Sequence, residues 1–144
     1  MNLLFAKGGG RDTRYLQWGT RGTPVVLVPG AFETADAFAR LGRVLAKNHR
    51  VFAIDLSGTG YSAPNPPFSA GHLAGQILAF LAAEKLTGPN SSLLVGHSAG
   101  AADVGIAALE GPRAVKGVVF LLAYESGLVA PRQGSAIPAP PLGC

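Results

Sequence analysis

Four short, continuous apolar runs constrain the fold of this sequence more than any other feature. They are "PVVLVPG" (24–30), "RVFAIDL" (50–56), "SLLVG" (92–96) and "VKGVVFLLAY" (115–124), the last of which contains a strand within it. Continuous apolar runs bounded by Gly or Pro turns indicate strands that are buried on both faces. Because helical segments separate these runs, the sequence predicts an α/β fold with a mostly parallel sheet of about four to six strands, flanked by helices.

Helices are expected between the runs. They are predicted over about 35–47, from Ser69 to just before Gly88, and over 99–110. Thr34 is a suitable N-cap for the first helix. The prolines of "PNPPF" (64–68) exclude regular structure there, and "YLQW" (15–18) is expected to add an earlier, antiparallel strand.

The chain divides into one domain and a short tail. Its 144 residues, of which 48% are hydrophobic, suit a single domain with a modest core and argue against global disorder. The segment 127–144 is rich in Gly and Pro and predicts an irregular end. We therefore expect an α/β domain over 1–126 and a tail over 127–144.

Cysteine content and hydropathy favour a cytoplasmic protein. The single cysteine, Cys144, has no internal partner for a disulfide, which fits a reducing compartment. No stretch approaches the ~18 apolar residues of a membrane span. The apolar start "MNLLFA" is followed at once by Lys7, so it lacks the apolar core of a signal peptide. We expect no membrane contact.

The basic charge does not indicate nucleic-acid binding. The formal net charge is +4 and the isoelectric point is about 9.6. The basic side chains of the expected helix 35–47 share one face, opposite its apolar side chains. The basic ones are Arg40, Arg43 and Lys47, and the apolar ones are Phe38, Leu41 and Leu45. No aromatic residues interleave with the basic ones, so a solvated helix face explains the pattern.

The stretch "LLVGHSAGAA" (93–102) carries a candidate nucleophile. Its Gly-His-Ser-Ala-Gly matches the G-x-S-x-G pattern of a nucleophile elbow, in which a strand turns sharply into a helix and exposes the serine. A chance match in a chain this rich in Gly has a probability of roughly 0.15, so the context carries the argument. Here a predicted strand precedes Ser98 and a predicted helix follows it. The N–H of Ala99 would then lie at a helix N-terminus, where it can stabilise an oxyanion. The alternative is that Ser98 only caps an ordinary helix.

With two further stretches, this motif resembles the α/β-hydrolase family over about residues 14–125. "VVLVPGAF" resembles the family's strand and oxyanion loop, with Pro29 in place of the usual His. "DLSGTGYS" resembles the Asp-x-x-Gly-x-Gly-x-Ser turn after the next strand, and "LLVGHSAG" matches the elbow. The resemblance implies that Ser98 is the nucleophile and that the N–H groups of Ala31 and Ala99 form the oxyanion hole. We expect no cofactor and no metal.

The rest of a catalytic triad is harder to find. The family order is Ser, then Asp or Glu, then His, but no histidine follows Ser98. His97 is expected to point away from the serine, His49 to lie at the opposite edge of the sheet, and His72 to be a first-turn helix residue. None is a convincing base.

The sequence offers one candidate for the acid of the triad. Glu125 follows the fourth run, at the carboxyl edge of the sheet, and is the candidate, with a solvated loop residue as the alternative. Asp103, one turn into the helix 99–110, is expected to be a surface or packing residue.

Competing motifs are weaker. "GTGYSA" (58–63) fits a dinucleotide fingerprint, but "APNPPF" excludes the helix that must follow it. "GGG" (8–10) lacks the remaining residues of a P-loop, and no cluster of Cys, His and carboxylates has metal-ligand spacing.

Two functions remain open. The first is hydrolysis of an ester or similar small acyl substrate through an acyl-enzyme at Ser98; acyltransferase, lyase and peroxidase activities also occur in the family. The second is a catalytically silent, shortened hydrolase that acts as an interaction module or a fragment. Because family members are considerably longer, the run 115–124 is expected to leave an apolar sheet edge uncovered, which a second copy of the chain could cover.

Overall fold

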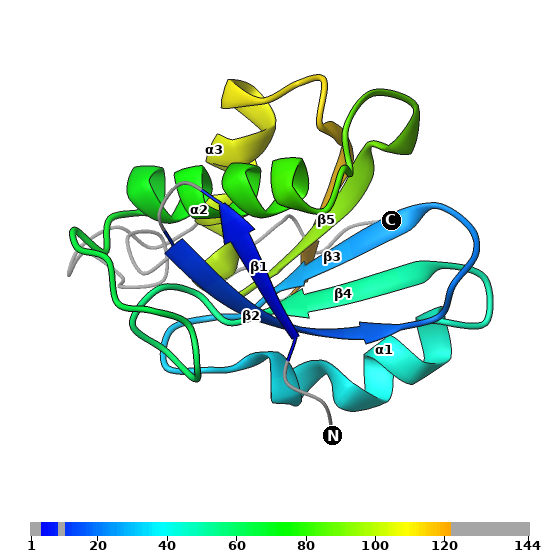
Figure 1. Cartoon of the computed structure of the whole chain (residues 1–144), viewed down its shortest axis with the longest axis horizontal. Coiled ribbons are helices and arrows are strands. Elements are labelled where there is room, and N and C mark those ends of the chain that lie inside the picture. Colours follow the sequence, from blue (N-terminus) through cyan, green and yellow to red (C-terminus); the bar gives the residue numbers. More distant parts are fainter. Residues whose placement is uncertain (1–3, 9–10, 122–144) are drawn as a thin grey trace, which may run out of the picture.

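A computed structural model describes residues 4–8 and 11–121 of the chain. These residues form a six-stranded sheet in the order β1-β2-β4-β3-β5-β6, with helices on both faces (Figure 1). The strands are β1 (Leu4–Gly8), β2 (Arg11–Trp18), β3 (Pro24–Val28), β4 (Arg50–Ile54), β5 (Ser92–His97) and β6 (Val115–Leu121). The helices are α1 (Ala39–Leu45), α2 (Ala70–Ala83) and α3 (Gly100–Glu110), with short 3-10 turns η1 (Ala35–Phe38) and η2 (Gly88–Asn90). The expected α/β class and the mostly parallel sheet are confirmed.

The four apolar runs become the four neighbouring strands of the parallel part of the sheet. β3 pairs in parallel with β4 and β5, and β5 pairs in parallel with β6. The antiparallel strand expected at 15–18 is confirmed as the end of β2, which pairs with β4. β1 pairs antiparallel with β2. This strand is not predicted from the sequence, because the first residues are tested there only as a possible signal peptide.

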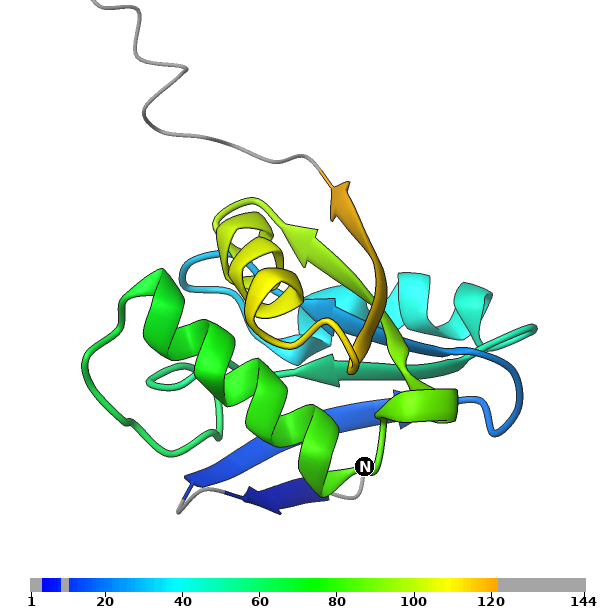
Figure 2. The ribbon, with the colours of Figure 1, turned by 90° about the horizontal axis from the view of Figure 1, so that it is seen from above.

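The core lies in two layers, one on each side of the sheet. In β3, Val26 and Val28 face the layer that holds α2 and α3, while Val25 and Leu27 face the layer that holds α1. Figures 1 and 2 show α1 on one face of the sheet and the two longer helices together on the other. Burial on both faces explains why β3 is apolar at nearly every position.

The expected helix over 35–47 is divided. η1 covers the first turn and α1 begins at Ala39, and Thr34 occupies the N-cap position of η1 without a side-chain cap. The N-cap of α2 is as expected, because Ser69 Oγ accepts the main-chain N–H of His72. The basic face of the first helix is also confirmed, since the three basic side chains are exposed.

β6 is one of the two edge strands of the described sheet, the other being β1, and it is apolar on both faces from Val118 to Leu121. The exposed fractions of Val119, Phe120 and Leu121 are 48%, 58% and 37%. The uncovered apolar edge is therefore present in this part of the chain, as the sequence suggests. The residues after Leu121, including the expected tail, lie outside the described residues. No helix in the described residues has the length and hydropathy to cross a membrane.

Candidate active site

Ser98 lies in the sharp turn between β5 and α3. Its φ is +54°, in the left-handed region that residues other than glycine rarely adopt. The Ser98 N–H donates to the Leu121 carbonyl at 3.2 Å, and the Ser98 carbonyl accepts from the Ala101 N–H at 3.0 Å. The strand-turn-helix context predicted for residues 92–110 is confirmed. A residue held in this strained conformation by its surroundings is typical of a functional site.

The two glycines of the motif are required by close approaches between backbones. A Cβ on Gly96 would lie 2.5 Å from the Gly100 carbonyl oxygen, and one on Gly100 would lie 2.5 Å from the Pro29 carbonyl oxygen. Real Cβ atoms do not come this close to backbone oxygens, so neither site tolerates a side chain without movement. Gly96 lets α3 pack on β5, and Gly100 lets α3 approach the end of β3.

The loop after β3 wraps against this turn. A Cβ on Gly30 would lie 3.0 Å from the Cβ of Ser98. The loop closes through the Glu33 N–H, which donates to the Gly30 carbonyl at 3.2 Å, and Phe32 takes a φ of +61° within it. Ala31 and Ala99 are exposed, and neither amide has an acceptor among the described residues. The oxyanion hole from these two amides stays a prediction, with both amides on segments that touch at Gly30 and Ser98.

Glu33 and His97 connect the two segments. His97 Nδ1 lies 2.8 Å from Glu33 Oε2, and the same oxygen accepts the Gly30 N–H at 3.0 Å. Partial burial acts to raise the pKa of Glu33, but the hydrogen bonds from His97 and Gly30 outweigh it and lower this pKa below its usual value. The His97 ring also meets the Phe38 ring edge-on, at 6.4 Å between centroids. Sequence reasoning missed Glu33.

The other histidines lie where the sequence suggested. His49 precedes β4, and its Nδ1 lies 3.3 Å from the Thr23 carbonyl. His72 is in the first turn of α2. Within the described part of the chain, no side chain hydrogen-bonds to the Ser98 hydroxyl.

The structure describes Asp103 but not Glu125, the candidate for the acid. Glu125 lies outside the described residues, so its role stays a prediction. Asp103 is 4% exposed, which makes it a packing residue and not a surface one. Its burial in α3 raises its pKa to about 6.

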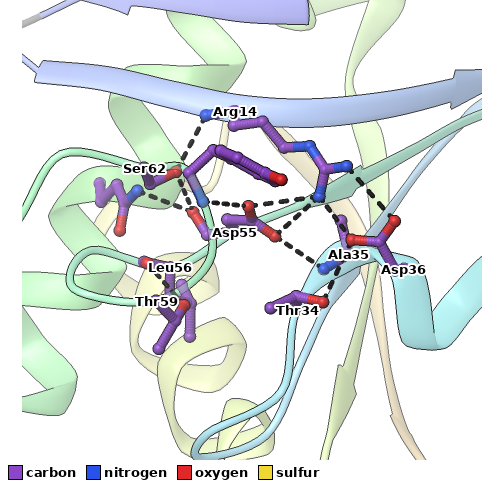
Figure 3. A network of polar contacts seen from close by, with 10 residues as sticks. Arg14, Thr34, Ala35, Asp36, Asp55, Leu56, Thr59 and Ser62 are labelled. Carbon is purple, nitrogen blue, oxygen red and sulfur yellow. Dashed lines mark hydrogen bonds and ion pairs between the residues drawn. The ribbon is translucent and has the colours of Figure 1, made fainter. Parts of the chain in front are cut away.

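A buried polar network joins β2, the turn after β4 and the start of η1 (Figure 3). Arg14 is 2% exposed, and its Nη1 lies 2.7 Å from Asp36 Oδ2 and 3.3 Å from both carboxylate oxygens of Asp55. Asp55 also accepts the N–H groups of Ala35 and Tyr61, each at 2.8 Å. The Asp of the "DLSGTGYS" turn therefore fixes its own turn and the start of η1 together.

A cavity of about 620 Å³ opens beside Ser98, between α3 and β6. Its lining is apolar apart from the serine, and includes Ile106, Leu109, Val118 and Phe120. The chemistry this arrangement can support is attack by a serine hydroxyl on an apolar substrate, with two backbone amides close by. Over residues 4–8 and 11–121, no group of three or more His, Cys, Asp or Glu side chains could hold a metal ion.

Comparison with known proteins agrees with this geometry. Residues 23–138 match the model of the alpha/beta hydrolase fold family. A polyketide synthase, ThaQ of Burkholderia thailandensis, is 33% identical over 119 residues, which are 83% of this chain and 6% of that protein. The 2-hydroxy-6-oxo-6-(2'-aminophenyl)hexa-2,4-dienoic acid hydrolase of Metapseudomonas resinovorans is 32% identical over 102 residues, which are 68% of this chain and 34% of that enzyme.

Solved structures show the same fold. A bacterial membrane phospholipase A superimposes with a TM-score of 0.77 at 23% identity, over 83% of this chain and 38% of that one. The chain thus spans well under half the length of these relatives. The family match, which covers most of the sequence, together with the strand order and the turn at Ser98, establishes that this chain belongs to the alpha/beta hydrolase fold family.

Proposed function

We propose that this protein is a serine hydrolase that cleaves an ester or a similar small acyl substrate through an acyl-enzyme at Ser98. The observation that carries the proposal is the left-handed backbone of Ser98 at the end of β5, pressed against the loop at Gly30. This conformation presents the hydroxyl at the carboxyl edge of the sheet, as a nucleophile elbow requires. A residue that only capped α3 would have the extended backbone of an N-cap and would need no strain.

The proposed reaction has two steps. Ser98 Oγ attacks the substrate carbonyl carbon, the bond from that carbon to the leaving-group oxygen breaks, and the leaving group departs as an alcohol with a proton. Water then attacks the acyl-enzyme, which releases the acid and restores the serine. The N–H groups of Ala31 and Ala99 would stabilise the negative oxygen in both steps, a contribution typically worth about 10²–10³ in rate for each donor.

A serine hydroxyl needs a base to take its proton. Glu125, shortly after β6, is proposed as the acid that would orient such a base. No histidine follows Ser98 in the sequence, and no described side chain contacts its hydroxyl. We therefore expect reactivity at Ser98 to increase when a base is supplied from solution.

The acyl group is expected to be apolar. The cavity beside Ser98 is lined by side chains of α3 and β6 that offer van der Waals contact and no charge. One relative is named as a hydrolase of an oxo-dienoic acid, a small carbonyl compound with an aryl end. We propose as substrate a small carbonyl compound whose acyl group is apolar.

Fluorophosphonate labelling of the purified chain tests the proposal. We expect label on Ser98, located by peptide mass, no label in Ser98→Ala, and a labelling rate that rises with added imidazole. Circular dichroism of both proteins controls for folding. A folded chain that takes no label even at high imidazole would contradict the proposal.

The edge at β6 favours a second candidate, a catalytically silent module that binds a second copy of itself. Val118 and Phe120 line the cavity on the α3 side, while Val119 and Leu121 line a smaller one on the α1 side. An edge strand that is apolar on both faces is suited to pairing with the same strand of a second chain. Sedimentation would show a dimer that Val119→Lys converts to a monomer; a monomeric parent chain would exclude this candidate.

A further inference from the structure

We infer that Glu33 and His97 form a positioning pair that fixes the separation of the two amides proposed as the oxyanion hole. This inference rests on the proposed function, because it concerns the same site. Neither residue would touch the substrate. Their role is to hold the loop after β3 against the turn after β5.

The two amides belong to segments that are distant in sequence. Ala31 lies in the loop between β3 and η1, and Ala99 lies between β5 and α3. An oxyanion hole works only if both N–H groups point at one oxygen, and a displacement of about 1 Å can cost on the order of a hundredfold in rate. Something must therefore set the distance between the segments.

The Glu33 carboxylate is placed to do this. One oxygen, Oε2, accepts from the Gly30 N–H at 3.0 Å, next to Ala31, and lies 2.8 Å from Nδ1 of His97, next to Ser98. An ionised carboxylate only accepts hydrogen bonds, so Nδ1 must carry the proton. Among the described residues, this is the side-chain hydrogen bond that joins the Gly30–Glu33 loop to the serine turn.

The surroundings of the pair limit its movement. Phe38 meets the His97 ring edge-on, and the Glu33 N–H closes the tight turn on the Gly30 carbonyl at 3.2 Å. A Cβ on Gly30 would lie 3.4 Å from Glu33 Oε2 and 3.0 Å from the Ser98 Cβ, so the carboxylate and the serine both lie close to Gly30. The side chains of His97 and Glu33 are only 26% and 36% exposed. A short, partly shielded hydrogen bond of this kind holds its geometry better than a fully solvated ion pair.

The test follows the amide signals of Ala31 and Ala99 by NMR in Glu33→Ala, His97→Ala and the double variant. We expect each single change to shift both amides, although Glu33 is remote in sequence from Ala99, and the double variant to add little to either. Glu33→Gln, whose amide oxygen can still accept, should return both signals toward their original positions. Glu110→Ala, an exposed carboxylate at the end of α3, is the matched control and should leave both unchanged. Nitrogen chemical shifts should show the His97 proton on Nδ1 in the parent chain.

Fluorophosphonate kinetics add the functional readout. We expect Glu33→Ala to reduce the maximal labelling rate of Ser98 by about a hundredfold. The fluorophosphonate concentration that gives half of the maximal rate should change little. If the parent chain does not label, the proposed function fails. The amide shifts still decide whether Glu33 and His97 position the amides of Ala31 and Ala99. An Ala99 signal that is unchanged in Glu33→Ala, or a Gln variant that behaves like Ala, would overturn the inference.

Discussion

Asp103 offers the most direct test of the energetics of this fold. It is a carboxyl group in α3 with an exposed fraction of 4%. Burial disfavours the charged form and raises its pKa from 3.8 to about 6. In the unfolded chain the same group ionises near its ordinary pKa.

The sign and size of the effect follow from this difference. Between pH 4 and 6 the unfolded chain loses a proton that the folded chain keeps, so stability falls as pH rises through this window and is level above it. A difference of about 2 pKa units corresponds to about 3 kcal/mol. We therefore expect Asp103→Asn, which removes the charge but keeps the shape, to be more stable than the parent by up to about 3 kcal/mol at pH 7.5 and about equal to it at pH 3.5.

Urea denaturation followed by the fluorescence of the single tryptophan, Trp18, measures this at a series of pH values. Glu110→Gln, an exposed carboxylate on the same helix, serves as the control and should change stability by less than about 0.5 kcal/mol. The reasoning would be refuted if Asp103→Asn gave no gain at pH 7.5, or if its gain were the same at every pH.

Five other substitutions separate local contacts from general destabilisation. Gly96→Ala should cost about 1–3 kcal/mol or more, because its Cβ would meet backbone at 2.5 Å, whereas Gly75→Ala, with nothing within 4 Å, should gain up to about 1 kcal/mol in urea denaturation. Ser92→Ala should be neutral or stabilising by about 1 kcal/mol by the same assay, because its buried hydroxyl has no hydrogen-bond partner among the described residues. Arg14→Leu should cost about 3–5 kcal/mol in thermal or urea unfolding, because it leaves a fully buried carboxylate without its cation. Asp36→Asn, at the exposed end of the same network, should cost about 1 kcal/mol or less.

The features that sequence reasoning predicted are those encoded locally. Continuous apolar runs identify β3, β4 and β5 because burial on both faces requires an apolar residue at nearly every position. β6 shares this pattern, although its last three residues are exposed in the described part of the chain. The elbow is equally local, since Gly96 and Gly100 are fixed by contacts within a few residues and with the end of β3. β1 was missed because "LFAKG" is short and carries a lysine, and it becomes a strand only through its pairing with β2.

Pairings between distant residues were not predictable. Glu33 and His97 are 64 positions apart, and Arg14 lies 41 positions from Asp55, so no spacing rule links them. The burial of Asp103 did leave a signal. It shares a helix face with Gly100 and Ala107, both buried, and a carboxylate on such a face is desolvated unless a partner reaches it.

The described residues supply some parts of the proposed site at Ser98 and not others, and this division is informative. The proposed nucleophile and both proposed oxyanion amides lie on β3, β5 and the two turns that follow them, and the contacts at Gly30, Gly96 and Gly100 and between Glu33 and His97 lie within the described residues. The proposed acid, Glu125, follows β6, and the base is not among the described neighbours of the serine. Backbone preorganisation requires a complete local fold, whereas a proton acceptor needs only to reach the hydroxyl. Imidazole rescue of labelling at Ser98 would therefore show that the elbow and amides act as a functional half-site on their own.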